Sequence, residues 1–255
     1  PNSRRQRQMC IRDSNNPSVL FNGMINAIIP FTIKGVIWYQ GEGNAGRYQN
    51  YTKLMNGLIK NWRDEWGLGD FPFYFVQLAP NGSLGQGNGT SQAFLREAQL
   101  KTMLSVKNTG MAVTLDIGST ITNHPPEKLL IGKRLAYWAL AKNYGFNTLP
   151  YSGPVYESMK VKNNKVYVNF KYARSGVTSY GKPLNGFEVA GKDKKFYKAD
   201  ASIDPHWSAG WENRSILILS SKHVSNPLYI RYGWKNYIEG TLYNVEGLPT
   251  SCLLY

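Results

Sequence analysis

The sequence predicts an α/β protein with a parallel sheet, followed by a second region rich in β-strands. Strand-like and helix-like segments alternate over residues 15–150, which is typical of a parallel sheet with helices on both faces. After Pro150 the apolar residues recur with a period of two, which indicates short strands separated by turns. Residues 35–44 run from an apolar segment into a glycine-rich polar turn and then a helical pattern. Open α/β sheets place ligands at such turns, at the carboxyl ends of their strands.

The elements of the first region follow from hydrophobic spacing. Apolar residues recur at intervals of three and four between residues 47 and 66 and predict a helix after the strand Val36 to Tyr39. Two more helices are expected, at Gln92 to Ser105 and from about Glu127 to Tyr144. The remaining segments of this region are strand Phe73 to Leu78, loop Asn81 to Thr90 and strand Met111 to Asp116.

The second region, residues 151–251, is interpreted as a β-rich accessory region because it contains no recognisable chemistry. Hairpin turns are expected at Asn163-Asn164 and near Lys192-Asp193. Its expected strands are Val155 to Val161, Lys165 to Phe170, Gly186 to Ala190, Lys195 to Lys198, Ile216 to Ser220 and Leu228 to Tyr232.

The net charge of +14 raises the question of nucleic-acid binding. Residues 1–14 contribute +3 of it, and the remaining charges are scattered along the chain. The sequence contains no helix-turn-helix, zinc-finger or RNA-recognition pattern, so we expect no nucleic-acid partner. A basic field of this size would nevertheless attract acidic glycans. No apolar run approaches 18 residues, so no membrane-spanning helix is expected.

The segment from Trp38 to Asn44 reads Trp-Tyr-Gln-Gly-Glu-Gly-Asn. A lone turn of this kind is more often structural than functional, because short motifs match by chance. Here one further match to a single protein family precedes the turn, and others follow it in that family's order. The matched segments are residues 20–25, 71–80, 95–99, 109–113, 226–234 and 242–249. On these residues the chain resembles the sialate O-acetylesterase-like carbohydrate esterases of the SGNH hydrolase superfamily, over roughly residues 15 to 251.

The resemblance implies an SGNH-hydrolase (flavodoxin-like) parallel sheet and hydrolysis of an acetyl ester on a sugar by a serine nucleophile. In that family the serine lies upstream, in a block that reads Gly-Gln-Ser-Asn, and this block does not occur here. We therefore expect the C-terminal part of a longer esterase, with a sheet incomplete at its N-terminus, and an inactive chain when it stands alone. The matched turn also departs from the family pattern, with Gly43 where serine is usual.

The resemblance assigns the general base to His124, which lies in a His-Pro pair after the strand Met111 to Asp116. An aspartate that orients the imidazole usually precedes this histidine by two or three residues, but the three positions before His124 are Ile, Thr and Asn. A Ser-His dyad with a backbone or hydroxyl group as the orienting partner is one alternative. Asp116, the nearest acid before His124 in sequence, is another. His206 and His223 lack this context and are interpreted as structural.

The turn supplies the other candidate site residues. The amide of Asn44 is expected to donate a hydrogen bond to the oxyanion. Gln40, Gly41, Glu42 and Arg96 are expected to bind substrate. For Glu42 the alternative is a buried carboxylate that fixes the turn, with the guanidinium of Arg96 as its partner. We expect Asn44 and His124 to meet in one cleft, at the carboxyl ends of neighbouring strands.

The function expected is a carbohydrate O-acetylesterase acting on sialic acid or a related glycan, with an acetylated sugar as its partner. This route needs no metal or organic cofactor. The alternative is a catalytically inactive, carbohydrate-binding member of the same family. The family implies a periplasmic or extracellular location, and the sequence predicts no oligomeric state.

Both ends are expected to be foreign to the fold. Residues 1–14 match nothing in the family and lack the apolar stretch of a signal peptide, so they are interpreted as a non-native leader. Residues 252–255 depart from the usual family ending and are interpreted as a non-native tail. The two cysteines, Cys10 and Cys252, lie in these ends, so no disulfide or thiolate metal site is expected in the body of the chain.

Overall fold

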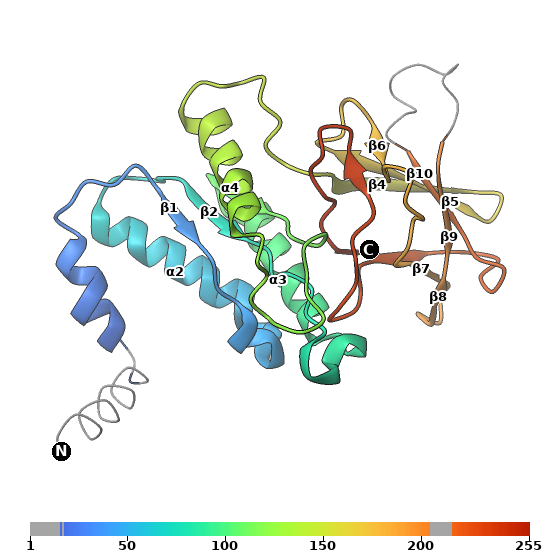
Figure 1. Ribbon diagram of the computed structural model, residues 1–255, viewed down its shortest axis with the longest axis horizontal. Coiled ribbons are helices and arrows are strands. Elements are labelled where there is room, and N and C mark those ends of the chain that lie inside the picture. Colours follow the sequence, from blue (N-terminus) through green and yellow to red (C-terminus); the bar gives the residue numbers. More distant parts are fainter. Residues whose placement is uncertain (1–15, 17, 205–215) are drawn as a thin grey trace.

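The structure is a computed structural model that describes residues 16, 18–204 and 216–255 (Figure 1). The interpretation of residues 1–14 and of His206 therefore lies outside the described residues. The first region contains η1 (Phe21–Ile25), η2 (Asn26–Ile28), β1 (Val36–Trp38), η3 (Glu42–Asn50), α2 (Tyr51–Trp66), β2 (Phe73–Val76), η4 (Ser83–Asn88), α3 (Ser91–Ser105), β3 (Thr109–Ala112) and α4 (Lys128–Asn143).

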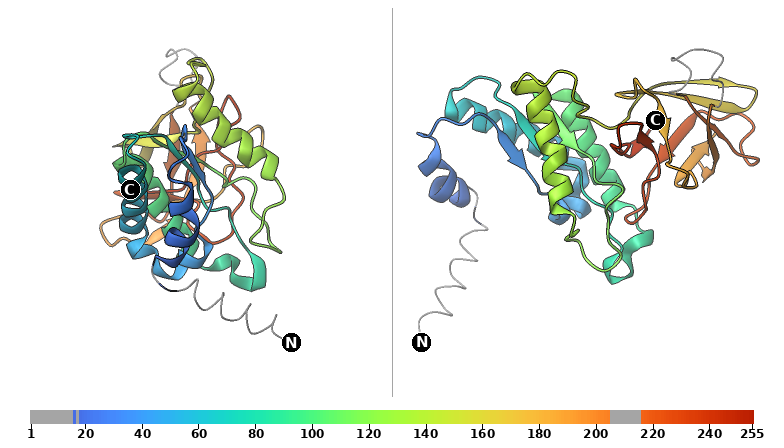
Figure 2. Two further views of the ribbon diagram at one scale, coloured as in Figure 1. Left: turned by 90° about the vertical axis from the view of Figure 1, so that its left-hand side faces the viewer. Right: turned by 45° about the horizontal axis from the view of Figure 1, so that its top comes forward.

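A three-stranded parallel sheet in the order β1-β2-β3 forms the centre of this region. Successive side chains of β2 point to opposite faces, as strand geometry requires. Phe73 and Phe75 belong to the core that α2 and α3 cover, whereas Tyr74 and Val76 pack with residues of α4. Helices therefore cover both faces of the sheet (Figures 1 and 2), which confirms the predicted fold class.

The second region is made of antiparallel strands. Its strands are β4 (Val155–Lys162), β5 (Lys165–Lys171), β6 (Val177–Thr178), β7 (Phe187–Ala190), β8 (Phe196–Lys198), β9 (Asp200–Ile203), β10 (Leu217–Ser220), β11 (Tyr229–Tyr232), β12 (Tyr243–Asn244) and β13 (Leu253–Leu254). They form sheets in the orders β4-β5-β10-β9, β13-β11-β7-β8 and β12-β6. Asn163 and Asn164 have φ angles of 51° and 61°, so the predicted hairpin turn between β4 and β5 is confirmed.

The sequence analysis did not predict four of the strands, β6, β9, β12 and β13. Three of them are only two residues long, too short for a period of two to be visible. The last lies in residues 252–255, which we had set aside from fold reasoning. In the structure Leu253 and Leu254 pair with β11, and the side chain of Cys252 has an exposed fraction of 0%. Cys252 and Leu253 are therefore buried in the fold.

The two regions share one hydrophobic core. Residues of the parallel sheet and of α3 belong to the same buried cluster as Leu242 and Leu253 from the end of the chain. The loop after β11 also crosses between the regions, because Gly240 donates its backbone N–H to Leu115 O at 2.9 Å. In Figure 1 the C-terminus lies at this junction.

Candidate functional site

The turn after β1 is held by a hydrogen bond between two of its own side chains. Gln40 Nε2 donates to Asn44 Oδ1 at 2.7 Å, and the backbone N–H of Asn44 donates to Gly41 O at 2.8 Å. The first bond occupies the carbonyl oxygen of the Asn44 side chain, and the second fixes its backbone. Its amide nitrogen makes no hydrogen bond with the described residues, so two N–H donors remain for a ligand.

Gly41 lets this turn lie directly on α3. A Cβ atom at this position would lie 3.2 Å from Leu95 Cδ2 and 3.3 Å from Gln99 Nε2, which is tighter than ordinary packing. The residue is buried, and its φ of 162° is extended backbone. Glycine is therefore needed here for close approach, and Gly41 shapes the site without offering a side chain to a substrate.

Two residues that the sequence analysis did not assign support the turn from behind. Tyr51 Oη donates to Gln40 O at 3.2 Å, and Gln99 Nε2 donates to the same oxygen at 3.4 Å. Gln99 also bonds the end of β2 and the residues after it, since its Nε2 donates to Val76 O at 3.1 Å and its Oε1 accepts from Leu78 N at 2.8 Å. A signal for Gln99 existed in the sequence, because this residue ends the matched run of residues 95–99.

The expected pairing of Glu42 with Arg96 is wrong. Arg96 has an exposed fraction of 0%, and its guanidinium donates to the backbone carbonyls of Gly233 (2.9 Å) and Lys235 in the loop after β11. These carbonyls accept hydrogen bonds from a buried cation in place of a carboxylate, while Nε of Arg96 has no partner among the described residues. Arg96 thus holds this loop to α3 and has no surface to offer a substrate. Glu42 is half-buried and forms no ion pair within the described residues.

The loop after β3 carries His124 and is held mainly through its backbone. Ser119 Oγ accepts from the backbone N–H groups of Ile121 (3.2 Å) and Thr122 (3.3 Å), and Thr122 Oγ1 accepts from His124 N at 3.0 Å. His124 itself is exposed, while the following Pro125 is buried. The imidazole makes no hydrogen bond with the described residues, so nothing in this part of the chain fixes its orientation.

Asp116, the acid kept as a candidate to orient His124, is held by another residue. Both of its oxygens accept from Arg134 on α4, at 2.8 Å and 2.6 Å, and Arg134 Nη1 also donates to Val113 O at 2.7 Å. The two side chains are 10% and 4% exposed. A bidentate carboxylate is a strong partner for a buried guanidinium, and this carboxylate faces Arg134 and makes no hydrogen bond with His124.

Topology places the two candidate segments on one edge of the sheet. The three strands are parallel, so the turn with Asn44 and the loop with His124 both leave from their carboxyl ends. We expected neighbouring strands, but β2 lies between β1 and β3. The segments are joined by Lys128, four positions after His124, whose Nζ lies 4.7 Å from the ring centroid of Tyr39, next to Gln40. A cation over an aromatic face is attractive at this distance.

Tyr39 is the titratable group at this contact. Burial raises the pKa of its phenol to about 12, and the negative charge of Glu42 adds to the increase. The phenol therefore stays neutral at physiological pH. Its hydroxyl is buried and has no hydrogen-bond partner among the described residues.

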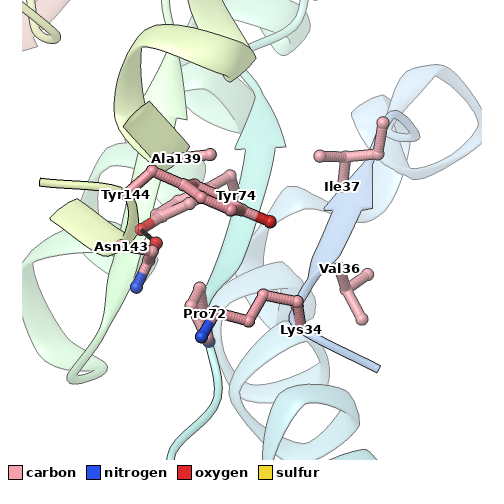
Figure 3. Close-up of a pocket in the computed structure, with 9 residues that line it drawn as sticks. Lys34, Val36, Ile37, Pro72, Tyr74, Ala139, Asn143 and Tyr144 are labelled. Carbon is pink, nitrogen blue, oxygen red and sulfur yellow. Dashed lines mark hydrogen bonds between the residues drawn. The ribbon is translucent and has the colours of Figure 1, made fainter. Parts of the chain in front are cut away.

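A cavity of about 160 Å³ lies near the opposite end of the sheet, between β1 and the end of α4 (Figure 3). None of the predicted site residues lines it. Ile37, on its wall, is 70% exposed, whereas all four residues of β2 are buried. The outer edge of β1 has no partner strand among the described residues. Its lining residues are Lys34, Gly35, Val36, Ile37, Pro72, Tyr74, Ala139, Asn143 and Tyr144.

Comparison with protein families gives one matching family model. Residues 13–140 match the model described as "Carbohydrate esterase, sialic acid-specific acetylesterase". The match includes both the turn with Asn44 and the loop with His124.

Curated relatives and a solved structure agree with this match. Sialate O-acetylesterase from Mus musculus is 28% identical over 245 residues, covering 85% of this chain and 42% of the relative. The Homo sapiens protein of the same name is 28% identical over 244 residues, covering 85% and 44%. A crystal structure of a carbohydrate acetylesterase from Xanthomonas citri superposes with a TM-score of 0.84 at 36% identity, covering 94% of this chain and 54% of that one. The chain thus spans about half the length of these proteins.

A search of the described helices for a membrane span found none that combines the required length with sufficient apolar character.

Proposed function

Because the chain belongs to the carbohydrate esterase family of sialic acid-specific acetylesterases, we propose that the whole protein hydrolyses O-acetyl esters on sugars, with Asn44 and His124 in its active site. The observation that carries this proposal is the hydrogen bond from Gln40 to Asn44, which leaves the amide N–H groups of Asn44 available at the carboxyl edge. Donors fixed in advance at the place where negative charge develops are the largest contribution in many acyl-transfer enzymes.

The proposed reaction follows from these two groups and a serine from the part of the whole protein outside this chain. The serine oxygen attacks the acetyl carbonyl carbon while His124 accepts the serine proton. The carbonyl oxygen becomes an oxyanion and accepts hydrogen bonds from Asn44. Collapse of this intermediate breaks the ester bond, and His124 returns the proton to the departing sugar hydroxyl. Water then releases acetate from the serine by the same steps, with no metal or organic cofactor.

We propose that the segment that carries the serine adds to the sheet beside β1. β1 is an edge strand among the described residues, so the backbone N–H and C=O groups of its outer edge can pair with a further strand. Strands of parallel sheets are normally buried on both faces, and the exposure of Ile37 leaves apolar surface that the added segment would cover. A strand added there would also end at the carboxyl edge, next to the turn with Asn44. The cavity in Figure 3 would then lie beneath the added strand.

The experiment compares this chain with the full-length protein on p-nitrophenyl acetate and on O-acetylated sialic acid. We expect no turnover by this chain, and turnover near the usual enzyme median of about 10 per second by the full-length protein. Replacing the serine by alanine in the full-length protein is the matched control and should remove the activity. Turnover by this chain alone at the rate of the full-length protein would contradict the proposed division of the site.

One observation favours a second function. The carboxylate of Asp116 is bound by Arg134, and His124 has no acidic partner among the described residues. A family member with an unoriented base would bind acetylated glycans without hydrolysing them. In that case the full-length protein would bind O-acetylated sialic acid and show no release of acetate.

A further inference from the structure

The β-rich region, to which the sequence analysis assigned no chemistry, contains a cavity of its own. Its volume is about 380 Å³, at the small end of the range of roughly 300–1,000 Å³ that small-molecule sites occupy. It lies between β7, the neighbouring strand β8 and the loop that follows β11. Its lining residues are Asn185, Gly186, Phe187, Glu188, Lys198, Trp234, Lys235, Tyr237 and Ile238.

The charge inside this cavity is positive and uncompensated. The one acidic lining residue, Glu188, already accepts from Arg231, at 2.7 Å and 3.1 Å. Lys198 and Lys235 are exposed, and neither forms an ion pair within the described residues. Two ammonium groups at the rim of a small concave site attract an anion of matching size.

Aromatic residues form the walls of the cavity and are held in place before any ligand binds. Phe187 stacks on Tyr232 with ring centroids 4.3 Å apart, and Trp234 meets Phe94 edge to face at 5.1 Å. Tyr237 is half-buried, and its backbone N–H donates to Gly87 O at 3.0 Å. A Cβ atom on Gly82 would lie 3.2 Å from the Cβ of Tyr237, so the glycine makes room for the tyrosine.

The backbone around the cavity is equally constrained. Gly186 has a φ of +81°, in the left-handed region that favours glycine, and a Cβ atom there would lie 2.3 Å from Ile238 Cδ1. The left-handed backbone is the feature that favours glycine here, and Ile238 packs over the position where a side chain would begin. A preformed site of this kind binds with little loss of conformational freedom.

We propose that this cavity binds an acidic sugar, a pyranose that carries a carboxylate, at a site separate from the proposed ester site. The carboxylate would pair with Lys198 and Lys235, a C–H face of the ring would pack on Tyr237, and the amide of Asn185 would bond a hydroxyl. The cavity is open at its rim but small, and its lining has two lysines and no extended row of cations, so it suits a single sugar unit better than a nucleic-acid backbone.

The cavity also adjoins the edge of the sheet that carries Asn44 and His124. The loop from Gly233 to Gly240 lines it and also contacts the segments after β2 and β3. Asn81 donates its backbone N–H to Asn236 O at 2.9 Å, and Gly240 donates to Leu115 O at 2.9 Å. An acidic unit held here would anchor one part of a glycan while another part reaches the carboxyl edge. The inference goes beyond ester hydrolysis and does not depend on it.

Titration of this chain with sodium glucuronate, followed by saturation-transfer NMR and calorimetry, tests the proposal. We expect saturable binding with a dissociation constant of about 1 mM, which ligand-efficiency bounds give for a molecule of this size. The neutral amide of the same sugar should bind at least about tenfold more weakly, because it lacks the charge that the lysines recognise. Absence of saturable glucuronate binding, or equal binding of the amide, would overturn the proposal.

Substitutions locate the site. Lys198→Gln and Lys235→Gln should each weaken glucuronate binding about fivefold to tenfold, whereas Lys162→Gln removes the same charge from β4 and should change nothing. Tyr237→Ala should lower affinity at least about tenfold, and Tyr237→Phe should keep it, because the ring face makes the contact. Thermal melts of each variant report folding, and the two conservative lysine variants keep the test valid if Tyr237→Ala unfolds.

One further variant separates this site from the ester site. His124→Ala should bind glucuronate with unchanged affinity. Equal loss of binding in His124→Ala and Lys235→Gln would place the sugar at the carboxyl edge and overturn the assignment to this cavity. Failure of ester hydrolysis in the full-length protein would leave the binding result unaffected.

Discussion

The two segments that supply the candidate site are built in different ways. In the turn after β1, side chains lock one another: Gln40 holds Asn44, and Gln99 and Tyr51 hold the backbone of Gln40. In the loop after β3, only backbone N–H groups are held, and the side chain of His124 is free of hydrogen bonds to the described residues. The oxyanion donor is thus preorganised within this chain, whereas the orientation of the base has to come from elsewhere or from the substrate.

The difference has a local cause. Gly41 permits the turn to touch α3, so the helix reaches the turn with Gln99. In the loop after β3, Asp116 is the nearest acid before His124 in sequence, and it serves a structural purpose because its carboxylate binds Arg134 in α4. In the turn after β1, the polar side chains hold the site. In the segment after β3, the carboxylate of Asp116 instead holds the helix α4 that follows.

The largest expected effect concerns the base. In the full-length protein, His124→Ala should lower kcat/KM for O-acetylated sialic acid by about a thousandfold or more, because nucleophile activation and proton return both pass through this residue. His223→Ala is the matched control, since His223 stacks on Tyr197 in the β-rich region at 5.3 Å. It should leave the rate within about twofold. Full activity in His124→Ala would contradict the assignment of His124 as the general base.

Breaking the buried ion pair tests what Asp116 does. Arg134→Leu should destabilise this chain by about 3–5 kcal/mol, because it leaves a carboxylate that is 10% exposed without its partner. Urea denaturation measures the change. The double variant Arg134→Leu with Asp116→Leu should recover part of the loss, and Lys133→Ala, on the exposed side of the same helix, should stay within about 0.5 kcal/mol. An unchanged free energy of unfolding in Arg134→Leu would mean that Asp116 does not depend on Arg134 and is available to orient His124.

The locked turn gives a third prediction. Asn44→Ala in the full-length protein should lower kcat by about a hundredfold to a thousandfold with little change in KM, as removal of a single oxyanion donor does. Asn61→Ala, on the exposed face of α2, is the control and should leave both constants unchanged. A rise in KM at constant kcat would instead make Asn44 a ground-state binding residue.

The fourth prediction concerns the orientation of the His124 imidazole. Thr122→Asp would place an acid two residues before His124, where the family pattern has one, and Asn123→Asp would place one directly before His124. If the base lacks an orienting group, one of these variants should raise kcat of the full-length protein by up to about tenfold, because a carboxylate stabilises the imidazolium. Thr122→Val is the control, since it removes the Oγ1 that bonds His124 N and adds no charge. Unchanged rates in both acidic variants would show that another group already orients the ring.

The sequence predicted the parts of this site that depend on local order along the chain. Strand β1, the turn with Asn44 and the position of His124 before α4 are all encoded within short segments, and parallel pairing then brings both to one edge. The partners of charged residues were not predictable in this way. Arg96 bonds the carbonyl of Gly233, which is 137 positions away, and Asp116 bonds Arg134, which is 18 positions after it. Such pairings depend on the three-dimensional packing, and the spacing of residues does not encode them.

The same limit applied to the end of the chain. Cys252 and Leu253 departed from the family ending, and nothing local indicated that they were structural. Their role follows from pairing with β11 and from burial against Arg96 and Gln77. Burial raises the pKa of the Cys252 thiol to about 11, so the group behaves as a small apolar side chain.

The smallest expected effect lies at the contact that joins the two segments. Tyr39→Phe keeps the ring beneath Lys128 and removes a buried hydroxyl without a partner among the described residues. At pH 7 the free energy of unfolding of this chain should be unchanged or higher by up to about 1 kcal/mol, because an unsatisfied buried polar group is lost. Tyr39→Leu loses the ring as well and should be less stable than Tyr39→Phe.

The pH dependence of the stability of Tyr39→Phe gives a further test of the contact between the two segments. The phenol of Tyr39 ionises near pH 10.0 in the unfolded chain and near pH 12 in the folded chain, because burial disfavours its charged form. Between these values the unfolded state binds fewer protons than the folded state, so this residue makes stability fall as the pH rises. Tyr39→Phe removes that contribution, and its advantage over the unmodified chain should grow from pH 10 to pH 11 in urea denaturation. An advantage that shrinks over this range would mean that the phenol of Tyr39 is accessible to water and that the contact between the two segments is looser than the structure has it.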